Sequence, residues 1–196
     1  FLYFIGEMVF TTPVPATVDV FYSLCQQVQA ENSLTRKSEM IQGCVRRWSG
    51  DLLLLFKMLL PKYTGRIYHL KDKQLMKLLA SLLKTHESTL KDHADKSGCI
   101  ATTAVHFFHP AGHRGGMSLQ QLEDHLAKLA AVTTEDQQRR LMSEFIAVAS
   151  RDELFVYLRQ IKLDLRLGAG IRIVLNGLHP SANDIYKQCA SIAEVV

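Results

Sequence analysis

The chain has 196 residues and a formal net charge of +4, with 47% hydrophobic and 21% charged residues. No apolar run approaches the roughly 20 residues that a membrane-spanning helix requires, so these numbers exclude an integral membrane protein and predict a soluble globular chain. The first residue is Phe1 rather than Met, so we expect a fragment or a processed product, and we recognise no signal peptide.

The cysteines are few and widely spaced, and no two of them form a C-x-x-C pair: Cys25, Cys44, Cys99 and Cys189. This spacing argues against a disulfide framework and against a zinc site built from cysteine, and it fits a reducing compartment. Positive charge is unevenly distributed. Ten Lys or Arg and three Asp or Glu lie between Arg36 and Lys77, so this segment carries +7 and the rest −3. Such a local excess suits a surface that binds polyanions, whereas the alternative is an ordinary set of solvated helix faces.

Apolar residues recur at helical spacing from Thr17 onward, which predicts an all-α fold, a compact domain of roughly ten helices over residues 17–196. Residues 1–16 are expected to form an extended lead-in that contains Pro13 and Pro15. The helices predicted in the first half are a helix after Thr17, one from Ser33 to about Trp48, Leu52–Leu60, Asp72–Lys84, a short helix within His86–Gly98, and Ile100–Phe108. Lys62–Leu70 is predicted to be a connector.

The second half carries clearer helix start signals. Three Ser or Thr residues are each followed three positions later by Gln or Glu, the pattern of a reciprocal capping box: Ser118 with Gln121, Thr134 with Gln137, and Ser150 with Glu153. These pairs predict the helices Leu119–Ala131, Glu135–Ala149 and Arg151–Leu167. Gly168 to Gly170 then interrupts the helical pattern, a short helix covers Ile171–Leu178, and Ser181 is expected to cap the last helix.

The turn around Gly168 and Gly170 is the most informative stretch for function. Two glycines between helices let a ligand approach the backbone closely, and the amides that open the next helix attract anions. Lys162, Arg166 and Arg172 flank the turn, so the segment is predicted to bind phosphate without reading bases. The alternative is an ordinary glycine C-cap surrounded by solvated charges.

This stretch, continued through His179-Pro180-Ser181-Ala182, resembles the end of the N-terminal DNA-binding domain of ATP-dependent DNA ligases, in particular the DNA ligase III and poxvirus branch. The resemblance runs from about Val18 to Val196 and includes further ordered blocks: Leu59-Leu60-Pro61, Arg66-Ile67-Tyr68, Leu70 to Gln74, Leu119 to Glu123, and Lys128 to Glu135. It implies an all-helical domain that grips nicked double-stranded DNA across the minor groove through backbone phosphates. It also implies a role in nick sealing during DNA replication, repair and recombination.

On this resemblance, two basic surfaces are expected to contact DNA and to lie on the same face of the fold. The first, a phosphate clamp, consists of Arg166, Gly168, Gly170 and Arg172, with Lys162 alongside. The second comes from the first half of the chain and consists of Lys62, Arg66, Lys71 and Lys73. Two separated clamps on a rigid body would span a groove and sense the shape of the duplex.

The ligase reaction needs a lysine in a Lys-x-Asp-Gly motif, and this motif is absent from the sequence. Lys62-Tyr63-Thr64-Gly65 has Thr in place of Asp, and we interpret it as a coincidence. The chain is therefore expected to bind DNA without catalytic residues, metal ligands or a cofactor of its own, while ATP and magnesium would serve the catalytic core of the parent enzyme. The expected location is the nucleus, with mitochondria or a viral replication compartment as alternatives, and repair proteins would bind other regions of the parent.

One segment departs from the family pattern. Gly98-Cys99 and Thr102 stand where the family usually has Gly-Asp and an acidic residue three positions later. If those carboxylates brace helices in relatives, the segment is less stable here, but DNA binding is not expected to depend on them.

Two other classes of function are weighed beside DNA binding. An all-α protein-interaction scaffold with a basic face would bind an acidic partner through a hydrophobic groove. A metal-dependent helical enzyme could use the cluster His86, His93, Cys99, His106, His109 and His113, but no pair has an acidic partner at ligand spacing.

Overall fold

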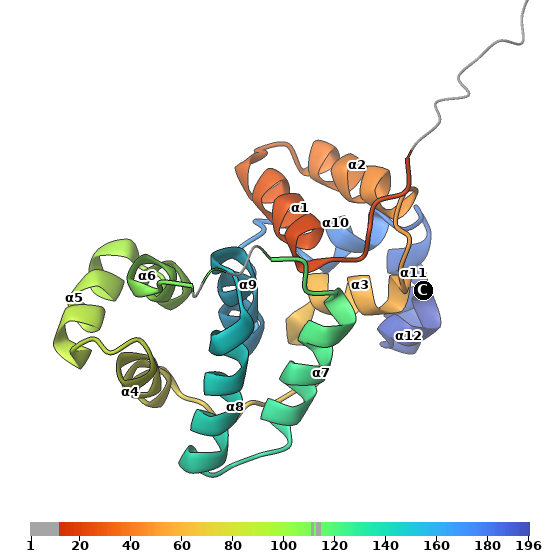
Figure 1. The fold of residues 1–196 in the computed structure, drawn as a ribbon. Helices are drawn as coiled ribbons and strands as arrows, with labels where there is room; N and C mark the ends of the chain where they lie inside the picture. Colours follow the sequence, from red (N-terminus) through yellow and green to blue (C-terminus); the bar gives the residue numbers. More distant parts are fainter. Residues whose placement is uncertain (1–11, 111, 113–114) are drawn as a thin grey trace, which may run out of the picture.

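The computed structural model describes residues 12–110, 112 and 115–196, and within them the chain forms twelve α-helices, one short 3-10 helix and no strand (Figure 1). The predicted all-α fold is therefore confirmed, with twelve helices rather than roughly ten. Residues 1–11, which make up most of the expected lead-in, lie outside the described residues. From Thr12 to Ala16 the chain is non-helical, and Val14 pairs with Trp48 in an isolated bridge.

The helices of the first half are α1 (Val18–Ala30), α2 (Leu34–Val45), α3 (Leu52–Leu59), the 3-10 helix η1 (Pro61–Tyr63), α4 (Asp72–Leu82), α5 (Glu87–Ser97) and α6 (Ile100–Phe107). Those of the second half are α7 (Leu119–Ala130), α8 (Glu135–Val148), α9 (Arg151–Ile161), α10 (Ile171–Asn176), α11 (Ala182–Cys189) and α12 (Ile192–Val195). The separate α12 was not predicted, and Ala190, whose φ of 53° is left-handed, ends α11 before it.

Helix α9 lies at the centre, and the other helices form groups around it (Figure 1). It packs against α6 on one side and against α1 and α7 on others. Helices α4, α5 and α6 pack in sequence as one group, while α2 pairs with α10, and α11 connects α10 to α12. Helix α12 returns to pack on α3, so the C-terminal segment closes over the first half of the chain.

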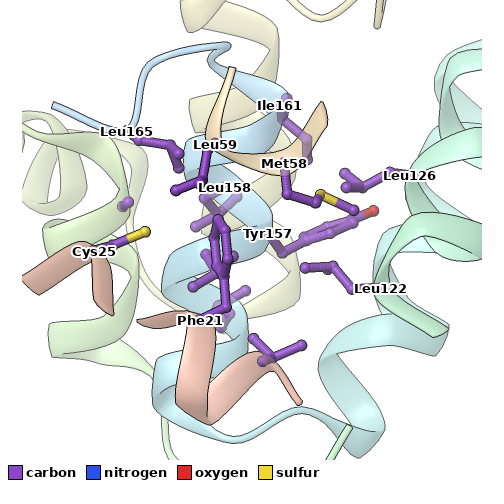
Figure 2. Packing of buried hydrophobic residues seen from close by; sticks show 14 of the residues in the cluster. Phe21, Cys25, Met58, Leu59, Leu122, Leu126, Tyr157, Leu158, Ile161 and Leu165 are labelled. Atoms are coloured by element: carbon purple, nitrogen blue, oxygen red, sulfur yellow. The ribbon is translucent and has the colours of Figure 1, made fainter. Parts of the chain in front are cut away.

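The hydrophobic core is built around α9, in which eight of eleven residues are buried. Figure 2 shows side chains from three other helices around it: Phe21 of α1, Met58 of α3, and Leu122 and Leu126 of α7. Tyr157 of α9 also stacks on Phe145 of α8, with ring centroids 3.9 Å apart. The apolar side chains of α9 stabilise the fold because these neighbouring helices cover them.

Two of the three predicted capping boxes are confirmed. In α7 and α9 the N-cap serine accepts a hydrogen bond from the backbone three residues later, and Gln121 and Glu153 accept the reciprocal bond. The prediction of a capping box at Thr134 is wrong, because the Thr134 hydroxyl donates to the Gln137 side chain at 2.7 Å instead of accepting from the backbone. Ser181 occupies the N-cap position of α11, but its side chain makes no capping bond.

Two predicted helix ends are wrong. Helix α2 stops at Val45 rather than near Trp48. The residues after Val45 pair with the lead-in instead, because the Val14 N–H donates to the carbonyl of Arg47. Helix α9 stops at Ile161 rather than Leu167, because Leu163 takes a left-handed φ of 53° and the Asp164 N–H turns back to the Arg159 carbonyl at 3.1 Å. Residues 162–170 are therefore a loop.

The segment that departs from the family pattern begins α6. Cys99 is the N-cap residue, and its sulfur accepts a hydrogen bond from the Thr102 N–H at 3.3 Å. Cys99 and Thr102 thus occupy the first and last positions of a potential capping box. The Cys99 sulfur accepts the hydrogen bond that a side-chain oxygen usually accepts at an N-cap.

Glu153 ties α9 to the segment before α7. Its side chain is 1% exposed, and its two oxygens accept from the Ser150 N–H at 2.7 Å and the Met117 N–H at 2.8 Å. We predict that Glu153→Gln lowers the free energy of unfolding by about 1–3 kcal/mol, because the amide nitrogen would face one of two partly buried N–H donors. Urea denaturation followed by circular dichroism measures this loss.

The matched control is Glu144→Gln on α8, where the carboxylate is exposed and pairs with Arg140 at 3.7 Å. This control should change the free energy of unfolding by less than about 0.5 kcal/mol. Equal effects of the two substitutions would contradict the role assigned to Glu153.

Candidate nucleic-acid interface

The loop of residues 162–170 connects α9 to α10 and carries most of the predicted phosphate clamp. Arg166 has a left-handed φ of 53°, and its N–H donates to the Asp164 carboxylate at 3.1 Å. Its guanidinium donates to the carbonyl of Gly98, the residue that ends α5, yet 45% of the side chain stays exposed. The loop thus presents a held but accessible cation.

Lys37 of α2 lies beneath this loop. It is 4% exposed, and its ammonium donates to the carbonyl of Leu167 at 2.5 Å and to that of Gly168 at 3.2 Å. No ion pair in the described part of the chain includes Lys37. Its charge is therefore satisfied by carbonyl dipoles rather than cancelled by a carboxylate, which leaves a positive field under the loop.

Lys37 was not predicted as a site residue, although the sequence contains a signal for it. In α2 the buried residues are Lys37, Ile41 and Cys44, at the i, i+4, i+7 spacing of a core-facing stripe. A lysine at a core position needs buried hydrogen-bond acceptors. The position of Lys37 on the core-facing stripe of α2 therefore indicates a structural role, whereas its charge alone does not indicate one.

The two glycines of the clamp differ in what the fold requires. Gly168 has a φ of +59°, and a Cβ there would lie 2.7 Å from the Lys37 ammonium, so glycine is needed at this position. Gly170 has extended backbone angles, and a Cβ there would meet nothing within 4 Å. The helix that follows, α10, has only six residues, so its dipole is short.

Lys62 lies beside this loop, although it is far away in the sequence. It is exposed on η1 and lines, with Arg166, two adjoining cavities of about 610 Å³ and 160 Å³. Lys162 lines the larger cavity and Gly170 the smaller. Lys62 and the glycine turn therefore share one face of the fold, as a groove-spanning interface requires.

The larger cavity has a mixed charge. Its cations are Lys62, Arg159, Lys162 and Arg166, and its carboxylates are Asp72, Asp95 and Asp164. The ammonium of Lys162 pairs with Asp72, the first residue of α4, which brings the start of α4 next to the end of α9. Lys71 and Lys73 flank Asp72 and are exposed, but neither lines the cavities.

Two predicted contacts lie apart from this cavity pair. The Arg66 guanidinium donates to both oxygens of Glu123 and is partly buried, and the bond to Glu123 raises the pKa of Arg66. Arg172 is exposed on α10 but lines a separate cavity of about 360 Å³ against α2. The basic excess between Arg36 and Lys77 is thus not one free surface, since Lys37 is buried and Arg66 is paired.

The histidine cluster does not form a metal site in the described residues, where no three His, Cys, Asp or Glu side chains meet. His93 and His106 stack with centroids 4.5 Å apart, and His93 Nδ1 is hydrogen-bonded to Thr103 at 3.0 Å. His113 lies outside the described residues. No helix among the described residues has the length and apolar character to cross a membrane.

Exposed large hydrophobic side chains, which a protein-interaction groove would gather, come from separate elements in the described residues: Leu34, Tyr63, Ile67, Val148, Ile185 and Val196. None of the cavities that hold the predicted cations is lined by more than one of them. Among the described residues, these cavities thus give the scaffold hypothesis no assembled apolar groove.

Comparison with known proteins gives one family and a consistent set of relatives. The family described as DNA ligase N terminus matches residues 17–179. A DNA ligase of Fowlpox virus is 28% identical over 188 residues, which are 92% of this chain and 33% of the relative. A DNA ligase of Vaccinia virus is 29% identical over 182 residues, 90% of this chain and 32% of the relative.

A cellular relative shows the same pattern. DNA ligase 3 of Dictyostelium discoideum is 24% identical over 178 residues, which are 89% of this chain and 15% of the relative. The chain thus spans about a third of the poxvirus relatives it matches and a smaller part of the cellular one. Because the family match covers most of the chain, the chain belongs to the DNA ligase N-terminus family.

Proposed function

We propose that this chain is the non-catalytic DNA-binding domain of an ATP-dependent DNA ligase and grips nicked duplex DNA through backbone phosphates. One observation carries the proposal: Lys62 of η1 and Arg166 of the 162–170 loop come from distant parts of the chain and line the same two cavities. Cations brought to one face from two rigid segments can neutralise phosphates on either side of a groove.

The ion pairs at this face are compatible with exchange for DNA. The Lys162 ammonium is paired with Asp72, whose side chain is 67% exposed, and pairs of this kind contribute only about 0–1 kcal/mol. A phosphate can therefore replace the carboxylate at small cost. Arg166 is held at its backbone and keeps half of its side chain in solvent, so it needs little reordering to bind.

The turn at Gly168 and Gly170 adds main-chain atoms to the proposed DNA-binding surface. Gly170 is exposed and has open space at its α-carbon, so a sugar–phosphate strand can pass close to the main chain there. The buried Lys37 ammonium adds positive potential from below. Such contacts fix position on a duplex and carry no base information, so binding should be nearly independent of sequence.

The wider role follows from the relatives and is part of the same proposal. These relatives are named DNA ligases, so we propose that the parent of this chain seals nicks, with ATP and magnesium used by a catalytic core outside this chain. Minor-groove binding, a place in DNA replication, repair and recombination, and location in the nucleus belong to the proposal too. Mitochondria or a viral replication compartment are the alternative locations.

The direct test is fluorescence anisotropy with nicked duplex, intact duplex and single-stranded DNA of equal length over a salt series. We predict salt-sensitive duplex binding, with a log–log slope of about 0.9 per phosphate neutralised. Arg166→Ala should weaken binding about 5- to 100-fold for unrelated sequences and lower the slope by about 1, because one charged phosphate contact is lost.

Arg140→Ala is the matched control, because Arg140 is an exposed arginine on α8 that lines neither cavity. It should leave affinity and slope nearly unchanged. If the Arg166→Ala chain keeps its fold and the salt slope of the unsubstituted chain, Arg166 does not belong to the interface. Absence of duplex binding at low salt would overturn the proposal.

Lys37 should act by positioning the loop rather than by touching DNA, because it is buried. We predict that Lys37→Met lowers the free energy of unfolding by about 1–3 kcal/mol, since the carbonyls of Leu167 and Gly168 lose their donor. Duplex affinity should fall several-fold with little change in the salt slope. Urea denaturation and the same anisotropy series measure the two effects.

Arg36→Met removes the same charge from the neighbouring exposed residue and serves as the control. It should preserve stability and should not reproduce the loss of affinity. Equal affinities of the two variants would show that the field and the anchoring supplied by Lys37 do not matter for binding.

A further inference from the structure

Cys99 differs from the other cysteines in its surroundings. It is the N-cap of the eight-residue helix α6, where unpaired backbone N–H groups favour a negative charge. Its sulfur already accepts the Thr102 N–H at 3.3 Å. Although only 7% of the residue is exposed, it lines the 610 Å³ cavity together with the exposed residues Lys62 and Asp72. This cavity is the route by which small reagents would reach the sulfur.

Arg159 is an independent observation at this cavity, because it is a buried cation whose hydrogen-bonding capacity is not fully used. It is 5% exposed and lines the same cavity, and among the described residues its Nε is buried without a hydrogen-bond partner. One terminal nitrogen donates to the Asp164 carbonyl at 3.4 Å, and the guanidinium lies 5.2 Å from the Phe155 ring centre. No ion pair of the described residues includes Arg159, so a buried cation lacks a carboxylate.

We propose that Cys99 is a modification site, a reactive thiolate that takes up soft electrophiles and hydroperoxides through the cavity it shares with Arg159. Helix N-termini and nearby cations are the settings in which protein thiols become nucleophiles. The inference does not require DNA binding, since it rests on the surroundings of the sulfur.

The electrostatics agree with this assignment. Burial by itself raises the pKa of the Cys99 thiol, but the hydrogen bonds from Thr102 and the charge of Arg159 together outweigh it, so the pKa lies below its ordinary value. Burial instead raises the pKa of Cys25 and Cys44. The other cations that face the cavity are Lys62, Lys162 and Arg166, and the carboxylates that face it are Asp72, Asp95 and Asp164.

The chemistry is simple for both reagents. With iodoacetamide, the thiolate attacks the methylene carbon, a C–S bond forms, the C–I bond breaks and iodide leaves. With hydrogen peroxide, the sulfur attacks one oxygen, an S–O bond forms and the O–O bond breaks. Hydroxide leaves and takes up a proton to form water, so peroxide is reduced while the sulfur is oxidised by two electrons to a sulfenic acid.

An adduct on Cys99 would also reach the proposed interface. Arg166 donates to the carbonyl of Gly98, the residue directly before Cys99, and lines the same cavity. Added bulk there would displace the Arg166 side chain. The effect on DNA rests on the proposed function, whereas the reactivity of the thiol does not.

The test is a rate measurement for each cysteine by peptide mass spectrometry, with limiting iodoacetamide between pH 6 and pH 9.5, on the folded chain and on the chain in urea. At neutral pH the folded chain should react at Cys99 at least about tenfold faster than at Cys25 and Cys44. The midpoint of the Cys99 rate profile should lie at lower pH in the folded chain than in urea, and Arg159→Gln should move it upward. Native alkylation of Cys189 with none at Cys99, or a Cys99 midpoint at or above the value in urea, would overturn the proposal.

A second arm separates this site from the DNA-binding role. Peroxide followed by dimedone should tag Cys99, and the treatment should lower duplex affinity several-fold in the natural chain but not in Cys99→Ser. Tagging of Cys99 in a chain that binds no DNA even when untreated would support the modification site and contradict only the proposed function. Absence of a tag at Cys99 would count against the site.

Discussion

Helix α9 is buried on nearly all sides, and the helices packed against it are positioned by that burial. Because eight of its eleven residues are buried, its position is set by α1, α6 and α7 together, and Glu153 fixes its start. The end of such a helix is as well placed as its middle. The 162–170 loop therefore begins at a fixed point, the end of α9, and Arg166 occupies a defined position on the surface.

Charge at this face is arranged in two levels. Lys37 lies below the loop and holds its carbonyls, while Lys62, Lys162 and Arg166 lie above and remain partly in solvent. The buried level shapes the backbone, and in the proposed function the exposed level would exchange weak partners such as Asp72 for phosphates. Arg66 belongs to neither level, since Glu123 holds it. Cys99 and Arg159 line the same cavity as the three exposed cations, so the proposed modification site adjoins the proposed DNA-binding surface.

The helices could be predicted well because apolar periodicity and capping residues are local signals. The glycine turn and Lys62 could also be predicted to share a face, because the resemblance to DNA ligases supplied the long-range relation. The early end of α9 could not, since the left-handed conformations of Leu163 and Arg166 are held by contacts such as Arg166 to Gly98. The pairing of Arg66 with Glu123 joins distant positions and leaves no local trace. Lys37 was predictable from its core register but was counted only as charge.

An amide NMR titration of the chain with a short nicked duplex would report which residues contact DNA without any substitution. If the 162–170 loop binds DNA, the largest shifts should fall in residues 61–64 and 162–170, which contribute to the lining of the two cavities. Signals of α8 (Glu135–Val148) should stay nearly fixed. Shifts centred on α8, or no shifts in the 162–170 loop at saturation, would contradict the claim that this loop is the DNA-binding element.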